Sequence, residues 1–200
     1  MRIDRRQIEN IVDKNFSNQI VFNTELLEVL INDILYLSSI DTHSPEPSAE
    51  TTSASTLLSL AAQWASHKVK PGVYVDCRLP SPDIQIRSDR GSIEEVLMKM
   101  LSNAAKFTIN GSIILECREN KDAGTVSFII TDTGSGIPEG HEEEIFDRFV
   151  KLDTFQQGTG LGLYICRRLA ETLGGTIYVD KKYRSGARFI FTIPKNISND

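Results

Sequence analysis

Hydrophobic residues in the first 40 positions recur at intervals of three and four. The apolar members of this pattern are Leu26, Leu27, Leu30, Ile31, Ile34, Leu35 and Leu37. Such spacing predicts one long helix with an apolar stripe along it. A stripe this long and narrow favours pairing with a second helix, and packing on the body of the same chain is the alternative.

A polar stretch from Asp41 to Thr56 interrupts the helical pattern. It is rich in Ser and Thr and contains two prolines, a composition typical of a linker between domains. The sequence therefore predicts a helical segment over residues 1–45 and a separate domain over residues 46–200.

Helical and alternating patterns follow one another after the linker, without regular strand–helix–strand units. Helices are predicted over 56–67, 92–107, 142–150 and 160–173, and strands over 73–77, 83–87, 112–118, 125–131, 176–179 and 187–193. Thr56 and Ser92 are the predicted caps of the first two helices, and Glu95 completes a capping box with Ser92. The order favours an α+β fold, in which helices cover one face of a mixed sheet.

The composition is that of an ordinary folded protein, with 40% hydrophobic and 24% charged residues. A net charge of -5 argues against a dedicated nucleic-acid-binding protein, because the phosphate backbone requires a basic face. Cys77, Cys117 and Cys166 lie far apart, which excludes a common zinc pattern and favours reduced thiols. We find no apolar run of the ~18 residues that a membrane span needs and no signal peptide. A cytoplasmic location is expected.

The stretch from Ile129 to Pro138 predicts a strand that ends in a carboxylate, Asp132. Gly134, Gly136 and Ile137 follow it. A carboxylate at a strand end accepts a hydrogen bond from an amine such as that of adenine, and glycines allow the backbone to approach a flat ring. An ordinary Asp- and Gly-rich turn is the alternative.

The helix predicted from Ser92 has one core-facing half and one mixed half. Its core-facing members are Val96, Leu97, Met100, Leu101, Ala104 and Thr108. Asn103, Lys106 and Phe107 fall on the other half. A nucleotide site explains this mixture, with the Asn103 oxygen on Mg²⁺, the Lys106 ammonium on a phosphate and the Phe107 ring against a base. Lys106 as an ordinary solvated lysine is the alternative.

A second glycine cluster comprises Gly158, Thr159, Gly160, Leu161 and Gly162 and leads directly into a predicted helix. Backbone N–H groups at a helix start form a natural anion site, although the spacing matches neither a Walker loop nor the dinucleotide fingerprint. A tight loop that requires positive φ is the alternative.

Two cations precede this glycine cluster. Arg148 and Lys151 lie beside the apolar anchors Phe146 and Phe149. The following residues, Leu152 to Gln157, lack periodicity and predict a mobile flap. Such a flap would bring Arg148 or Lys151 to the phosphates.

Four ordered boxes, at 101–108, 132–138, 145–151 and 158–163, resemble the ATP-binding domain of sensor histidine kinases, within the superfamily shared with DNA gyrase, MutL and the heat-shock chaperone ATPases. The resemblance implies a sandwich of a mixed sheet and three helices that binds ATP and Mg²⁺. It implies Asn103 as the metal ligand and catalytic roles for Asn103, Lys106 and Arg148. The implied nucleotide-binding residues are Asn103, Lys106, Phe107, Asp132, Gly134, Gly136, Ile137, Lys151, Gly158, Thr159, Gly160, Leu161 and Gly162.

The same resemblance implies transfer of the ATP γ-phosphoryl group to a histidine. Leu26 to Asp41 resembles the second helix of the kinases' dimerisation and phosphoacceptor hairpin. None of the three histidines, His43, His67 and His141, lies on the right helix. The chain is therefore expected to be a fragment of a larger sensor. Its implied partners are the phosphoacceptor helix of the parent kinase, a response-regulator receiver domain and a second copy bound through the N-terminal helix.

One departure from the family pattern concerns Lys99, which stands where these kinases usually have asparagine. Its ammonium would either repel Mg²⁺ or bind a phosphate. A non-catalytic nucleotide-binding module therefore remains an alternative. An ATP-hydrolysing enzyme is another, with Glu95 as the nearby candidate for a general base.

Overall fold

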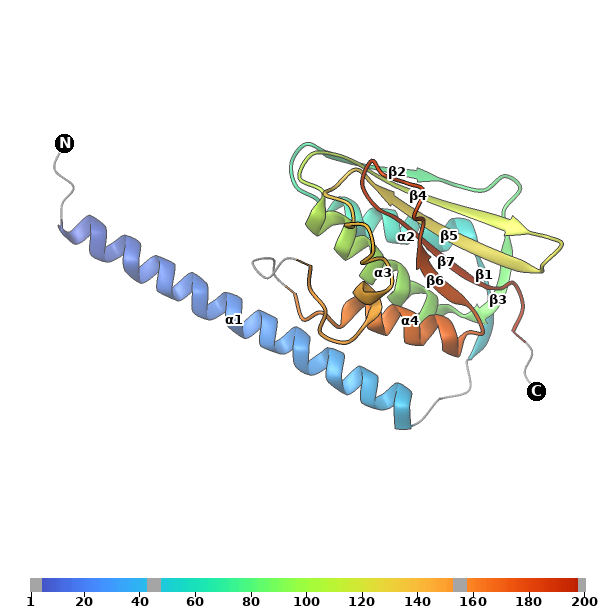
Figure 1. Cartoon of the computed structure of the whole chain (residues 1–200), viewed down its shortest axis with the longest axis horizontal. Helices are drawn as coiled ribbons and strands as arrows, with labels where there is room; N and C mark the ends of the chain where they lie inside the picture. Colours follow the sequence, from blue (N-terminus) through green and yellow to red (C-terminus); the bar gives the residue numbers. More distant parts are fainter. Residues whose placement is uncertain (1–4, 43–47, 153–157, 198–200) are drawn as a thin grey trace.

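A computed structural model describes residues 5–42, 48–152 and 158–197 of the chain. A long helix, α1 (Arg5–Thr42), runs along one side of a body made of a sheet and helices (Figure 1). The predicted domain boundary at residues 45 and 46 lies outside the described residues. None of the helices in the described ranges is long and apolar enough to cross a bilayer.

The main sheet is mixed, as predicted. Its strands are β2 (Val73–Arg78), β4 (Gly111–Asn120), β5 (Thr125–Asp132), β6 (Thr176–Val179) and β7 (Arg188–Pro194), in the order β2-β4-β5-β7-β6. β2 runs parallel to β4, and the other neighbours are antiparallel. β5 is therefore central, and its last residue is Asp132.

Helices α2 (Ala54–Ser66), α3 (Arg90–Phe107) and α4 (Gly162–Thr172) cover one face of this sheet (Figure 1). Alternate residues of β5, Val126, Phe128 and Ile130, are completely buried in the core beneath them. Each such side chain contributes about 1.5–3 kcal/mol by leaving water. The predicted division of α3 is confirmed, because all six residues predicted to face the core are buried, including Thr108 directly after the helix.

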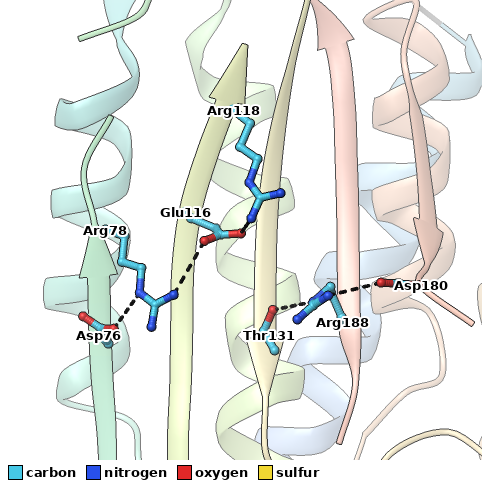
Figure 2. Close-up of polar contacts among 7 residues, drawn as sticks. All are labelled: Asp76, Arg78, Glu116, Arg118, Thr131, Asp180 and Arg188. Atoms are coloured by element: carbon cyan, nitrogen blue, oxygen red, sulfur yellow. Dashed lines mark hydrogen bonds and ion pairs between the residues drawn. The ribbon is translucent and has the colours of Figure 1, made fainter. Parts of the chain in front are cut away.

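The opposite face of the sheet carries ion pairs and hydrogen bonds, and the helices lie behind the strands (Figure 2). The guanidinium of Arg78 contacts Asp76 at 2.9 Å and Glu116 at 3.9 Å. Arg188 donates to Thr131 at 3.1 Å and to Asp180 at 3.3 Å. Exposed pairs of this kind are worth about 0–1 kcal/mol each, so the apolar face of the sheet is the one that holds the fold together.

The predicted linker was wrong in its second half. Residues Ala49–Ser53 form a strand, β1, which pairs antiparallel with β3 (Gln85–Asp89). A strand needs backbone hydrogen bonds more than apolar side chains, so a Thr-rich segment can join a sheet. Ser53 rather than Thr56 caps α2, since its side chain accepts a hydrogen bond from the Thr56 N–H.

Three other predicted helix boundaries also moved. α3 begins two residues early because Asp89 accepts a hydrogen bond from the Ser92 N–H at 2.7 Å, so Asp89 is the cap. The predicted helix over 142–150 shrinks to one 3₁₀ turn, η1 (Glu144–Phe146). α4 begins at Gly162 rather than Gly160, because Gly160 has a φ of 73° that no right-handed helix adopts.

The apolar stripe of α1 divides between two environments. Leu37 is buried against the body, and Leu30 and Tyr36 pack against the same core. Leu27, Ile31, Ile34 and Leu35 are instead 48–62% exposed. One side of α1 therefore packs on the chain's own body, and this second row remains on the surface.

Candidate functional site

The carboxyl end of α3 is the place where the two glycine segments meet. A Cβ on Gly134 would lie 2.6 Å from the backbone oxygen of Phe107, and a Cβ on Gly158 would lie 3.2 Å from Lys106 Nζ. The Lys106 ammonium also lies 4.7 Å from the centroid of the Phe107 ring. Asn103 is half-buried one turn earlier on the same helix. Two loops distant in sequence thus converge on two predicted site residues, Phe107 and Lys106.

Asp132 is held in one orientation at the end of β5. It is 2% exposed, and its Oδ1 accepts hydrogen bonds from the Gly134 N–H at 2.8 Å and the Ala187 N–H at 3.2 Å. No donor among the described residues bonds to its Oδ2. Burial raises the pKa of this carboxyl above its ordinary value, although both N–H groups act in the opposite direction. A buried carboxylate with one free oxygen is suited to accept a hydrogen bond from a ligand amine.

The turn before β7 passes close to this carboxylate. A Cβ on Gly186 would lie only 2.0 Å from the backbone oxygen of Asp132. The Gly186 carbonyl would in turn lie 3.0 Å from a Cβ on Gly136, which has a φ of 72°. Ile137 packs against the core beside it. Sequence reasoning missed Gly186 and Ala187, and only the Ser-Gly turn before the last strand could have indicated them.

The second glycine segment is tied to the chain upstream. Gly160 accepts a hydrogen bond from the Phe149 N–H at 2.9 Å, and a Cβ on Gly160 would lie 2.7 Å from the carbonyl carbon of Phe149. Leu161 is 1% exposed, so its side chain belongs to the core. The Leu161 N–H already donates to the Thr159 hydroxyl at 3.2 Å.

The first turn of α4 is nevertheless available to an anion. Among the described residues, no side chain caps this helix, and a Cβ on Gly162 would meet no atom within 4 Å. Uncapped N–H groups at a helix start attract anions through hydrogen bonding and the helix dipole. The open space around Gly162 fits the approach of a phosphate.

The two predicted cations occupy different settings. Arg148 donates to the Tyr164 hydroxyl at 2.6 Å, and its guanidinium lies 4.6 Å from the Tyr164 ring centroid. Lys151 is exposed. Most of the predicted flap, residues 153–157, lies outside the described residues. Tyr164 was not singled out from the sequence, although it occupies the first turn of the helix that the glycines introduce.

Lys99 takes part in an ion-pair cluster with α1. Its Nζ lies 2.9 Å from Asp33 Oδ1 and 3.1 Å from Glu95 Oε1. The other oxygen of Asp33 accepts a hydrogen bond from the Thr159 hydroxyl at 2.9 Å. Burial alone would lower the pKa of Lys99, but the bond and attraction to Asp33, together with Glu95, raise it above its ordinary value. Sequence reasoning missed Asp33, whose signal was a carboxylate spaced with Leu30 and Leu37 inside an apolar pattern.

A protein-only metal site is not present in the described ranges, where no three His, Cys, Asp or Glu residues group closely enough to hold an ion. Asn103, the predicted ligand, has a single amide oxygen. Mg²⁺ usually binds through one or two side chains, substrate phosphates and several waters. The residues present therefore fit Mg²⁺ only as a companion of a bound polyphosphate.

Comparisons with known proteins show which family the chain belongs to. Residues 88–197 match the model of the family described as "Histidine kinase-, DNA gyrase B-, and HSP90-like ATPase". The chain is 32% identical to hybrid signal transduction histidine kinase B of Dictyostelium discoideum over 93% of its own length and 10% of that protein. It is 30% identical to sensor histidine kinase WalK of Bacillus subtilis over 86% of its length and 29% of that protein.

Solved structures show the same fold. Full-length ShkA in complex with AMPPNP superposes with a TM-score of 0.78 at 28% identity, over 99% of this chain and 41% of that one. The catalytic domain of histidine kinase ThkA superposes with a TM-score of 0.59 at 28% identity, over 74% of this chain and 99% of that one. The chain thus spans a minor part of the two curated relatives and nearly all of an isolated kinase catalytic domain. By its matched residues and its fold, it belongs to the histidine kinase-, DNA gyrase B- and HSP90-like ATPase family, on the branch of the sensor histidine kinases.

Proposed function

We propose that this chain binds Mg²⁺–ATP at the carboxyl end of α3 and transfers the γ-phosphoryl group to a histidine of a sensor kinase. The observation that carries the proposal is the convergence of Gly134 and Gly158 on Phe107 and Lys106. Gly134 follows the strand-end carboxylate Asp132, and Gly158 precedes the start of α4 at Gly162. These contacts therefore support one shared site at the end of α3. The nucleotide analogue named with ShkA supports the same ligand class.

The adenine would be recognised at the Asp132 side of the site. Asp132 Oδ2 would accept a hydrogen bond from the adenine amine, while Oδ1 remains on its two backbone donors. Gly134 and Gly136 would allow the backbone and Ile137 to lie against the ring. Phe107 would contact the other side of the base.

The phosphates would lie toward Gly158 and the start of α4. Lys106 Nζ already lies beside Gly158, and the α4 N–H groups would donate hydrogen bonds to the phosphate oxygens. Mg²⁺, held by the Asn103 oxygen and phosphate oxygens, would neutralise charge on the polyphosphate. Arg148 and Lys151 are the further cations proposed to act on the γ-phosphate.

The chemical step would be an in-line displacement. A nitrogen of a neutral imidazole forms a bond to the γ-phosphorus, while the bond from phosphorus to the bridging oxygen breaks and ADP leaves. The protein contributes position and charge neutralisation rather than covalent chemistry. None of the described groups that face the site is required to act as a nucleophile.

The acceptor histidine would come from a phosphoacceptor helix, in a cytoplasmic assembly. The exposed row Leu27, Ile31, Ile34 and Leu35 is the surface proposed to pair with that helix and with a second copy of the chain. A response-regulator receiver domain would then take the phosphoryl group.

Phosphoryl transfer in trans tests this function. The purified chain is incubated with γ-labelled ATP, Mg²⁺ and a separate polypeptide that carries the phosphoacceptor helix. We expect acid-labile, base-stable label on the added polypeptide and none on residues 1–200. Binding without transfer would indicate a nucleotide-binding module instead, and steady ATP hydrolysis without label would indicate an ATPase.

A further inference from the structure

Asp33 brings the N-terminal helix into contact with the candidate phosphate end of the site. Its side chain is 8% exposed, and each of its oxygens has a different partner, Lys99 on α3 and Thr159 in the glycine segment. A buried carboxylate is costly unless it is paired and hydrogen-bonded. Residues of the body supply both the ion pair and the hydrogen bond that Asp33 requires. This contact therefore attaches α1 to the body.

The charges of this cluster do not favour a bound polyphosphate. Two carboxylates, Asp33 and Glu95, contact one ammonium, Lys99, so the group is negative overall. Thr159 lies between two glycines of the proposed phosphate loop, and its hydroxyl donates to the Asp33 carboxylate. A phosphate oxygen at that loop would lie close to the negatively charged Asp33 carboxylate. The Thr159 hydroxyl would not be available to bind it, because this hydroxyl already donates to Asp33. Low-dielectric surroundings strengthen such repulsion.

Without Asp33, the remaining residues of this cluster would favour the binding of a phosphate. Lys99 would retain Glu95, which lies one turn away on its own helix and is 40% exposed. The rest of the ammonium and the Thr159 hydroxyl would then be available as donors. Lysine binds phosphate as a flexible point charge, and Lys99 lies on the same mixed half of α3 as Asn103 and Lys106.

We propose that Lys99 and Thr159 form an additional phosphate-binding edge of the nucleotide site, and that Asp33 of α1 competes with the nucleotide's phosphates for this edge. Docking of α1 and binding of ATP therefore oppose each other. This inference rests on the proposed nucleotide site. It adds Lys99 as a binding residue beside Thr159, and Asp33 as a competitor.

Calorimetric titration with Mg²⁺–ATP and with adenosine tests the competition. Asp33→Asn removes the charge and keeps a hydrogen-bond acceptor for Thr159. We expect this variant to bind ATP about five- to tenfold more tightly and adenosine unchanged. Glu28→Gln is the matched control, because Glu28 is exposed on the same helix and contacts no partner in the described part of the chain. It should change neither affinity.

A second variant identifies Lys99 as the phosphate ligand. Lys99→Met in the Asp33→Asn background should abolish the gain for ATP and leave adenosine binding intact. The inference is overturned if Asp33→Asn behaves like Glu28→Gln, if both ligands change together, or if the added Lys99→Met has no effect. Absence of ATP and adenosine binding by the unaltered chain would instead overturn the proposed function itself.

Discussion

The backbone oxygen of Phe107 lies 2.6 Å from the position that a Cβ on Gly134 would occupy. The same Cβ would lie 2.9 Å from Asp132 Oδ1. Gly134 is therefore pressed between the end of α3 and the carboxylate at the end of β5. Real Cβ atoms do not approach other atoms so closely, so this contact fixes the distance between the two halves of the proposed adenine site.

Gly134→Ala should consequently impair nucleotide binding more than it impairs folding. The added methyl group has to displace either the α3 terminus or the Asp132 side chain, and both are proposed to contact the base. We expect ATP affinity to fall by about tenfold or more, since misplacement of one charged hydrogen bond costs about 1.5–3 kcal/mol. Calorimetry measures the affinity, and circular dichroism monitors the fold. Gly91→Ala is the control, because in the described part of the chain a Cβ there would meet only Asp89 Oδ1, at 3.6 Å. Equal affinities for both variants would contradict the assignment.

Asp132→Asn should separate binding from stability. The pKa of Asp132 is raised by burial, so the ionised carboxylate is less stable in the folded chain than in the unfolded chain. This difference lowers the free energy of unfolding. The penalty is fully present above the pKa of the folded state and disappears as the pH falls below the pKa of the unfolded state. At pH 7 the substitution removes the penalty, so we expect a higher Tm in the absence of nucleotide. The free energy of ATP binding should become less favourable by about 1–3 kcal/mol. A lower Tm with unchanged affinity would exclude the proposed role.

The sequence was sufficient to predict the structure wherever a local pattern of residues determines it. The division of α3 into buried and mixed halves, the strand that ends at Asp132 and the class of the fold all follow from periodicity. Helix boundaries did not, because caps such as Asp89 compete with equally suitable neighbours. The Asp33 contacts were the hardest to predict from the sequence, because they join residues 66 and 126 positions apart. No local spacing of residues indicates which carboxylate an ammonium group will contact.

Thiol reactivity should follow burial on the helical side of the sheet. Burial raises the pKa of Cys117 and Cys166 to about 12. Cys77 is only partly buried, and this partial burial also raises its pKa. The thiolate is the reactive form, so a disulfide reagent at pH 8 should modify Cys77 first. We expect one early reaction per chain, lost in Cys77→Ser, and three reactions after unfolding. Rapid modification of Cys166 in the folded chain would contradict its burial on the core-facing side of α4.

Mg²⁺ should bind to this chain only together with a polyphosphate. Asn103 is the one side chain proposed as a ligand, and the described residues include no acidic or histidine cluster to complete a coordination sphere. Mg²⁺ alone should therefore give no heat in calorimetry at millimolar concentration, while it should strengthen ATP binding. Asn103→Ala should lower the Mg²⁺-dependent part of the ATP affinity by about 10- to 100-fold and leave binding of metal-free ATP nearly unchanged. Ser102→Ala, at the exposed neighbouring position, should retain the full Mg²⁺ effect. If both variants respond equally to Mg²⁺, the metal is held by the phosphates without Asn103, and this ligand assignment fails while the nucleotide site stands.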